Sequence, residues 1–251
     1  MFKYFFYREI KEKYIGNITG ISWVFIQPII TLIIYWIVFD KIFGARIPEA
    51  KDIGFIVYLA IGFWPWIAFS ESVMRSITVI SEQSSLIGKV KMDFKILVIA
   101  AISASFLLNL IGYILVLIGL VLFADKFHYS GFVFLIFPLI QLYIFALALG
   151  LLLSALQIFI KDVLLFMTTI MTMWFFLTPV IYSESILPEK FKMVIKFNPL
   201  YTPISFIHKA VISNQPLPWI DMCIETLLLI VFLYTSIKIF DKLSPSFEMF
   251  K

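Results

Sequence analysis

The stretch ILVIAAISASFLLNLIGYILVLIGLVLFA, residues 96–124, contains no charged side chain. A helix crosses hydrocarbon about 30 Å thick with roughly 20 apolar residues, and a charge at mid-depth costs about 2.5 to 3.5 kcal/mol. This stretch is therefore long and apolar enough to span a bilayer as one helix. Comparable charge-free stretches occupy most of the remaining sequence, so we expect the whole chain to lie in a membrane.

The composition indicates one integral membrane domain. Of 251 residues, 62% are hydrophobic and 14% charged, with a mean hydropathy of +1.01, whereas about 25% of residues are charged in soluble proteins. The net charge of +4 is modest, and its lysines and arginines suit lipid head groups better than nucleic acid. The single cysteine, Cys223, and the histidines His128 and His208 fit no metal-ligand spacing. No catalytic site, metal site or nucleic-acid partner is predicted.

The alternation of apolar and polar stretches predicts an all-α integral membrane fold with six transmembrane helices. An even number of crossings puts both termini on one side, and that side carries more lysine and arginine than the other. By the positive-inside rule, both termini are expected in the cytoplasm. The predicted spans cover about residues 21–43, 53–80, 96–123, 132–160, 163–182 and 219–240.

Two segments outside these spans have helical character of another kind. Residues 1–16 alternate aromatic and charged side chains, which predicts an interfacial helix lying on the membrane surface; a flexible basic tail is the alternative. The proline-rich segment 183–218 holds two apolar pieces that are too short to cross. It predicts two short re-entrant helices joined at Asn198-Pro199, between spans five and six.

The sequence contains no energy source of its own. It lacks the G-x-x-x-x-G-K-[ST] phosphate loop of nucleotide hydrolases. Ion-coupled transport usually needs a carboxylate deep in the bilayer, and Glu225 is the one candidate; alternatively it faces a solvated outer cavity. A separate partner would therefore have to hydrolyse the nucleotide.

The loop between spans two and three is a candidate contact site for such a partner. It has a capping-type start at Ser81 and a glycine stop at Gly88, which predicts a small surface helix. That helix would act as a lever, whereas a solvated connector is the alternative. The predicted contact residues are Glu82, Gln83, Ser84, Ser85, Leu86, Ile87 and Lys89.

Aromatic side chains recur along several predicted spans. Rigid rings with polar tips suit the flat faces and hydroxyl rims of sugars, so a lined conduit for a saccharide is one interpretation. Aromatic residues also collect at bilayer interfaces and face lipid, which is the alternative for most of them. The candidate conduit residues are Tyr35, Phe39, Phe43, Tyr58, Trp66, Phe69, Trp174 and Tyr182.

Four ordered motifs carry a family resemblance. They are GLLLSALQIFIKDV at 150–163, WFFLTPVIY at 174–182, LPEKF at 187–191 and FNPLY at 197–201. In this order and spacing they resemble the type-2 ABC export permeases that export O-antigen, capsular and teichoic-acid polymers. The resemblance extends more weakly over nearly the whole chain, including LIGKV at 86–90.

The resemblance implies a homodimer in the bacterial inner membrane, bound to two ATP-binding cassette subunits that carry ATP and Mg. Lipid-linked polysaccharide would pass along the dimer interface. The loop around 81–90 would be the coupling helix, Lys161 and Asp162 would form a second contact with the ATPase, and the re-entrant pair would close the outer mouth. The chain departs from the family pattern at Lys161, where arginine is usual, and at 92–94, where Met-Asp-Phe replaces Phe-Pro.

Three other functions are weighed against polysaccharide export. An exporter of drugs or small lipids with the same fold would need an enclosed pocket, which the sequence does not decide. A membrane enzyme would need paired carboxylates or a metal site, and Asp40, Glu49, Asp52 and Asp125 are scattered. A passive channel would need a selectivity-filter motif or a charged ring, and neither is present.

Overall fold

The computed structural model describes residues 1–12, 22–44, 47–48, 51, 53–83, 93–123, 129–212 and 217–250. Throughout these residues the regular secondary structure is helical, which confirms the predicted all-α fold. A helix satisfies its own backbone hydrogen bonds, and hydrocarbon offers no other partner for them.

Within the described residues, five apolar helices are long enough to cross a membrane. The first joins α2 to a π-helical continuation, η2, and the fourth joins a 3₁₀ segment, η5, to α5. A sixth apolar helix, α6, is shorter. The bounds are Trp23–Trp36 for α2, Ile37–Ile42 for η2, Phe55–Glu82 for α3, Phe94–Phe123 for α4, Tyr129–Leu135 for η5, Ile136–Phe159 for α5, Val163–Leu177 for α6 and Trp219–Leu243 for α9.

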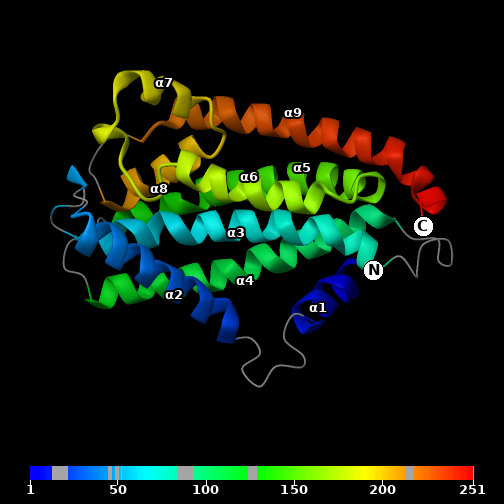
Figure 1. Ribbon diagram of the computed structural model, residues 1–251, viewed down its shortest axis with the longest axis horizontal. Coiled ribbons are helices and arrows are strands. Elements are labelled where there is room, and N and C mark those ends of the chain that lie inside the picture. Colours follow the sequence, from blue (N-terminus) through cyan, green and yellow to red (C-terminus); the bar gives the residue numbers. More distant parts are fainter. Residues whose placement is uncertain are drawn as a thin grey trace.

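The long helices run side by side along the longest axis of the molecule (Figure 1). One end, which we call the terminal end, holds α1 and the end of α9 with its 3₁₀ continuation η7. The opposite end, which we call the short-helix end, holds α7 and α8. These two are the short helices expected between spans five and six. The bounds are Phe2–Glu12 for α1, Glu184–Ile186 for the 3₁₀ turn η6, Glu189–Lys196 for α7, Tyr201–Ile212 for α8 and Ser244–Phe250 for η7.

Helix α3 is the centre of the bundle. It packs against α2, α4, α5, α6 and α8, and it is buried over most of its length, whereas α2 and α9 are mostly exposed. Ile61, Phe69 and Ile77, spaced along more than half of the helix, have no exposed surface. The other helices are therefore positioned chiefly by their contacts with α3.

The outer faces of α4 and α9 are apolar. A large contiguous apolar surface is rare on a soluble protein, but it matches the hydrocarbon of a bilayer. These faces, with the five apolar helices, define a multi-pass membrane protein. The exposed side chains include Ile111, Ile114, Leu115 and Leu122 on α4, and Ile220, Leu227, Leu228 and Val231 on α9.

Helix α6 ends earlier than the predicted fifth span, 163–182. Thr178 precedes Pro179, and a residue before proline is disfavoured in the helical conformation; Thr178 is extended, with φ −102° and ψ 138°. Asn198 Nδ2 then donates to the Leu177 carbonyl at 3.2 Å and to Thr178 Oγ1 at 3.0 Å. A side chain from the short-helix segment thus satisfies a carbonyl that the end of α6 leaves unpaired.

Gly150 allows α5 to approach α3 and α4 closely. A Cβ at this position would lie 2.5 Å from Ile102 Cδ1 and 2.8 Å from Ser76 Oγ. We predict that Gly150→Val lowers the free energy of unfolding by about 1–3 kcal/mol, because overpacking forces the neighbouring helices apart. Thermal unfolding in detergent measures this. Gly119→Val is the matched control, since a Cβ on Gly119 has nothing within 4 Å; equal melting temperatures for the two variants would contradict the packing.

Candidate functional site

At the terminal end, Arg75 joins α1 to the end of α3. Its guanidinium donates to both carboxylate oxygens of Glu9, at 2.7 and 3.0 Å, and to both of Glu82, at 2.8 and 2.7 Å. Only 8% of the Glu9 side chain is exposed, so this ion pair is largely shielded from water. Shielded pairs with two-point geometry are stronger than surface pairs. We call Glu9, Arg75 and Glu82 the α1 clasp.

A second contact supports the clasp: Arg8 Nη1 donates to Gln83 Oε1 at 3.1 Å. In the sequence, Glu71 and Arg75 are four residues apart, a spacing that predicts an ion pair on one face of a helix. The structure contradicts this prediction, because Arg75 extends toward Glu9 and Glu82, and Glu71 accepts from Asn109 Nδ2 at 3.1 Å. Helical spacing predicts neighbours within one helix, but it does not predict contact with a carboxylate from another helix, such as Glu9 of α1.

Two of the predicted coupling residues are therefore placed next to α1. Glu82 is the last residue of α3 and Gln83 follows it, and both make the contacts just described. The remaining predicted residues of this group lie outside the described residues. They are Ser84, Ser85, Leu86, Ile87 and Lys89.

The other predicted contact, Lys161 with Asp162, forms the turn between α5 and α6, also at the terminal end (Figure 1). Gln157 fixes this turn from within: its Nε2 donates to the Lys161 carbonyl at 3.0 Å, and its Oε1 accepts from the Leu164 amide at 3.0 Å. Both Lys161 and Asp162 are exposed. The turn is rigid in its backbone and presents one charge of each sign outward.

Six of the eight predicted conduit aromatics belong to one cluster of rings that joins α2, α3 and α6, whereas Tyr58 stacks on His208 and the Tyr182 carbonyl accepts from the Tyr58 hydroxyl. Tyr35 stacks on Phe175 with centroids 5.4 Å apart, and Phe175 contacts Trp66 at 5.6 Å. Phe69 contacts Trp174 at 6.0 Å. Phe63 and Phe175 were not in the predicted set; Phe63 completes the cluster by contacting both Tyr35 and Phe175.

The members of the predicted set differ in how much of each ring is accessible. Those on α3 are buried within the chain and pack in its core. Tyr58, Trp66 and Phe69 are buried; Tyr35, Phe39, Trp174 and Tyr182 are partly buried; Phe43 is 70% exposed.

Two of the sequence motifs meet at Asn198. Trp174 Nε1 donates to Asn198 Oδ1 at 2.8 Å, the same oxygen accepts from the Leu200 amide at 3.0 Å, and Nδ2 caps the end of α6. The residues of 174–182 and 197–201 are therefore one structural unit, in which the entry to α8 is fixed to the end of α6. Neither motif predicts this contact alone.

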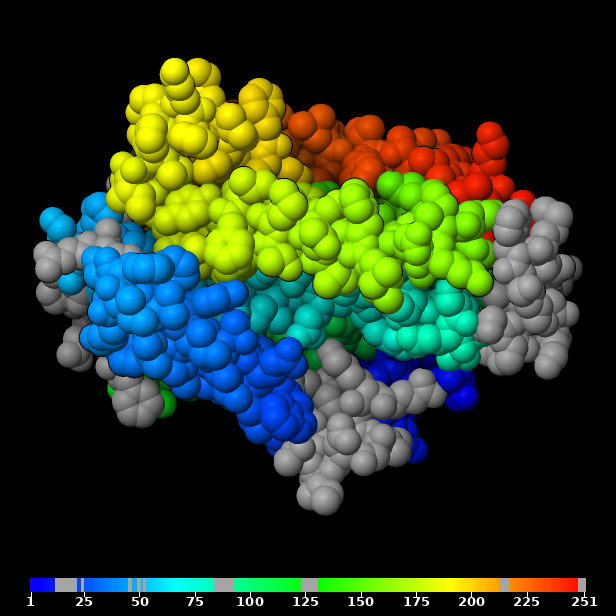
Figure 2. Space-filling model, viewed as in Figure 1, coloured from blue at the N-terminus to red at the C-terminus, as the bar shows by residue number. Residues whose placement is uncertain are grey.

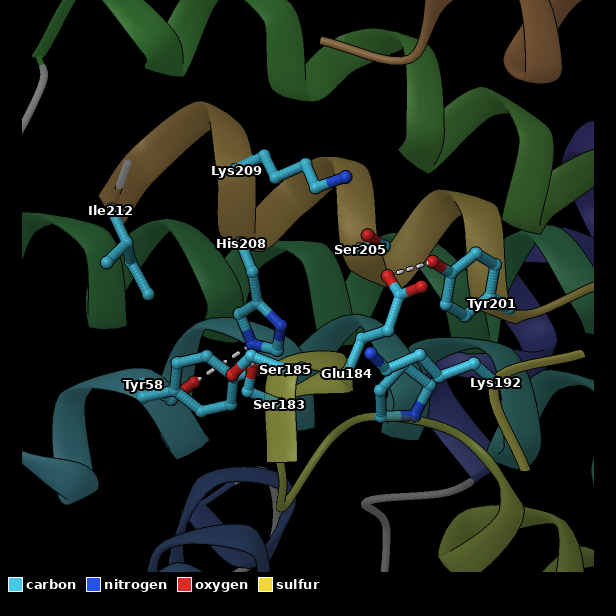
Figure 3. A pocket seen from close by; sticks show the side chains of 11 residues that line it. Tyr58, Ser183, Glu184, Ser185, Lys192, Tyr201, Ser205, His208, Lys209 and Ile212 are labelled. Carbon is cyan, nitrogen blue, oxygen red and sulfur yellow. Dashed lines mark hydrogen bonds between the residues drawn. The ribbon is translucent and has the colours of Figure 1, made fainter. Parts of the chain in front are cut away.

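A polar cavity of about 240 Å³ lies at the short-helix end, between α3, the 179–185 segment, α7 and α8 (Figure 3). The Tyr201 hydroxyl donates to Glu184 across it. On its other side the Tyr58 hydroxyl donates to the Tyr182 carbonyl at 3.1 Å. The cavity wall is thus held together by bonds between segments distant in the sequence.

His208 forms the inner wall of this cavity. Its Nε2 donates to the Tyr58 carbonyl at 3.1 Å, and its ring stacks on the Tyr58 ring with centroids 3.9 Å apart. Gly62 makes this approach possible, since a Cβ there would lie 2.6 Å from Nε2. Burial lowers the pKa of His208 to about 3, so the ring is neutral in the fold and its Nδ1 is an acceptor.

The lowered pKa of His208 makes stability fall in acid. An unfolded histidine has a pKa of about 6.5, so below that pH the unfolded chain binds a proton that the folded chain excludes until about pH 3. The free energy of unfolding therefore decreases as the pH falls, by up to about 2 kcal/mol from pH 7 to 5. We predict that His208→Gln reduces the loss of melting temperature between these two pH values. An equal loss in both proteins would show that His208 is not the group responsible.

The geometry described so far is that of a multi-pass helical membrane protein. A family model described as "ABC-2 type transporter" matches residues 1–212, and the chain belongs to this family. Members associate with ATP-binding subunits.

Two curated relatives are similar to the chain over most of its length. The chain is 29% identical over 217 residues to the O-antigen export system permease protein RfbA of Myxococcus xanthus, covering 84% of this chain and 79% of the relative. It is 22% identical over 240 residues to the protein of the same name from Klebsiella pneumoniae, covering 96% of this chain and 90% of the relative.

Proposed function

We propose that this chain is the membrane-spanning permease subunit of an ATP-driven exporter that moves lipid-linked, O-antigen-like polysaccharide across the bacterial inner membrane. The observation that carries the proposal is the similarity to O-antigen export permeases over 84% to 96% of the chain. The chain makes and breaks no bonds itself. ATP and Mg are bound by two separate ATP-binding subunits.

The proposed orientation places the two ends of the bundle on opposite sides of the membrane. The terminal end faces the cytoplasm and the short-helix end faces outward. Helix α6 and the turn residues after it supply one crossing in addition to those of the five long helices. Helices α7 and α8 enter the membrane from outside without crossing and close the outer mouth. The Asn198 junction supports this, because it ties the entry of α8 to the end of a crossing helix.

The ATP-binding subunits act on the terminal end. They contact the segment 82–89 and the turn at Lys161 and Asp162. The α1 clasp connects the segment 82–89 to both α1 and α3. A displacement of this segment by the ATP-binding subunit is therefore transmitted to the buried helix α3. A change of state requires that the partner bind one state better than the other, and exposed charges on a rigid turn provide such differential contacts.

The conduit lies between two copies of the chain, along the face formed by α2 and α6. Figure 2 shows this face, with α2 in blue, α6 in yellow-green and part of α3 between them. The exposed side chains of α2 and α6 include large apolar ones, among them Ile30, Ile34, Phe166, Met173 and Phe176. Tyr35 of α2 stacks on Phe175 of α6 and so joins the two helices, and separation of the copies along this face would open a path with an aromatic wall.

The coupling turn is tested by exchanging its charges. We predict that Lys161→Glu with Asp162→Lys lowers ATP-dependent export roughly tenfold, the effect of losing about 1.4 kcal/mol of coupling between permease and ATPase. Polymer export and ATPase stimulation are measured in reconstituted vesicles.

The matched control exchanges the ion pair of Asp40 and Lys41 in η2, whose side chains are 27% and 60% exposed. It should leave export unchanged. Normal coupling in the Lys161/Asp162 exchange would remove this turn from the ATPase interface.

The aromatic wall is tested separately. We predict that Tyr35→Leu with Phe39→Leu slows export about tenfold without loss of assembly, because each ring contributes about 0.5–1.5 kcal/mol of contact that leucine does not replace. Export is assayed in cells, and assembly by co-purification of the ATP-binding subunit. Tyr234→Leu is the control, since Tyr234 is an exposed ring on α9. Unaltered export in the double variant would assign Tyr35 and Phe39 a purely structural role.

A further inference from the structure

The segment after α9 packs on the terminal end of the bundle (Figure 1). Helix α9 ends at Leu243, because Pro245 has no N–H to donate to the Asp241 carbonyl four residues earlier. The Ser244 hydroxyl donates to that carbonyl instead, at 3.3 Å. The chain continues as the tighter turns of η7, which contact α5 and α9. The family model matches residues 1–212, so this segment lies beyond the part of the chain that the family describes.

Phe247 of η7 is packed among three helix ends. Its side chain has no exposed surface. Its ring centroid lies 5.9 Å from that of Phe94, the first residue of α4, and 6.0 Å from that of Phe159, the last residue of α5. It lies 5.6 Å from that of Phe240, in the last turn of α9. Aromatic pairs at these distances attract one another beyond simple burial. These four rings, which we call the Phe247 cluster, hold the ends of α4, α5 and α9 together.

An ion pair runs beside the Phe247 cluster. Lys95 Nζ lies 2.8 Å from Asp241 Oδ1, and the two side chains are 29% and 45% exposed. Lys95 follows Phe94 and Asp241 follows Phe240, so the ion pair joins the same ends of α4 and α9 as the rings do. Exposed ion pairs contribute little to stability, whereas a buried ring is costly to remove from a packed interior. The ring of Phe247 is therefore the stronger tie between these helix ends.

Two of the joined helix ends adjoin the contacts that we propose for the ATP-binding subunit. Phe159 stands two residues before Lys161 in the α5–α6 turn, and Phe94 begins the helix that follows the segment 82–89. The α1 clasp holds the start of that segment. The Phe247 cluster holds the helix after it and the nearby turn. Because close-packed interiors do not deform continuously, one contact cannot shift against the other without disrupting the packing around Phe247.

We propose that Phe247 is a positioning residue for energy coupling. It holds the segment 82–89 and the turn at Lys161 and Asp162 in a fixed relative position, so that the ATP-binding subunit moves them as one unit. The inference rests on the proposed function, from which it takes these two contacts. It adds a role for η7, which touches neither the conduit face nor the short-helix end.

Amide hydrogen exchange of the full chain in detergent, without the ATP-binding subunit, tests the positioning directly. The variant is Phe247→Leu, which keeps an apolar side chain but loses the three ring contacts. The amides to follow are those of Ile96, Ile160 and Val163, which donate to carbonyls at the start of α4 and around the turn. We expect exchange at all three to be roughly tenfold faster, as a loss of about 1.4 kcal/mol of local stability gives.

The matched control is Phe106→Leu. Phe106 is also buried, and its ring contacts Tyr143 at 5.2 Å, but it lies in the middle of α4. This variant also loses a packed ring, so its melting temperature should fall comparably. Exchange at the start of α4 and around the turn should not change.

Transport per ATP hydrolysed is then measured for both variants, reconstituted with the ATP-binding subunit. We expect it to fall roughly fivefold in Phe247→Leu, the lower end of coupling between sites, and to be unchanged in Phe106→Leu. Unaltered exchange in Phe247→Leu, or an equal fall of transport per ATP in both variants, would overturn the proposal. Export without ATP by the unchanged assembly would contradict the proposed function itself, and faster exchange in Phe247→Leu would then identify the cluster as purely structural.

Discussion

Hydrocarbon offers a protein backbone no hydrogen-bond partner and a charge no solvation, and this constraint shapes the whole molecule. The described chain meets the first condition by being helical throughout its regular structure. It meets the second by placing its ion pairs near helix ends, as in the α1 clasp and the Lys95–Asp241 pair at 2.8 Å. The chemistry of the chain is therefore concentrated at the two ends, with an apolar bundle between them.

Helix α3 physically connects those ends. At the terminal end its last turns hold Glu9 of α1 through Arg75. At the short-helix end its first turns hold His208 of α8, through the Tyr58 carbonyl and the stacked rings. The 28 residues between Phe55 and Glu82 extend about 42 Å, as one buried helix. In the proposed function, this helix is the rigid element that both the ATPase contacts and the outer helices touch.

The sequence predicts those parts of the structure that depend on a single segment. Charge-free length located the long helices, and short proline-bounded apolar pieces located α7 and α8. The sequence does not predict the contacts between distant segments. Nothing in the spacing of 174–182 and 197–201 reveals that Asn198 caps α6, and helical periodicity gave Arg75 the wrong partner. The burial of individual side chains was not predictable from the sequence either. Tyr58, Trp66 and Phe69 recur along the sequence as conduit residues would. The structure buries them, because α3 is surrounded by other helices.

The central claim is that this bundle moves its cargo only when a separate subunit supplies the energy. Transport of a labelled lipid-linked polysaccharide into sealed vesicles tests it most directly, with the chain reconstituted alone or together with its ATP-binding subunit, with and without ATP. The account predicts vectorial movement only when both subunits and ATP are present. Directed movement by the chain alone without nucleotide would contradict it.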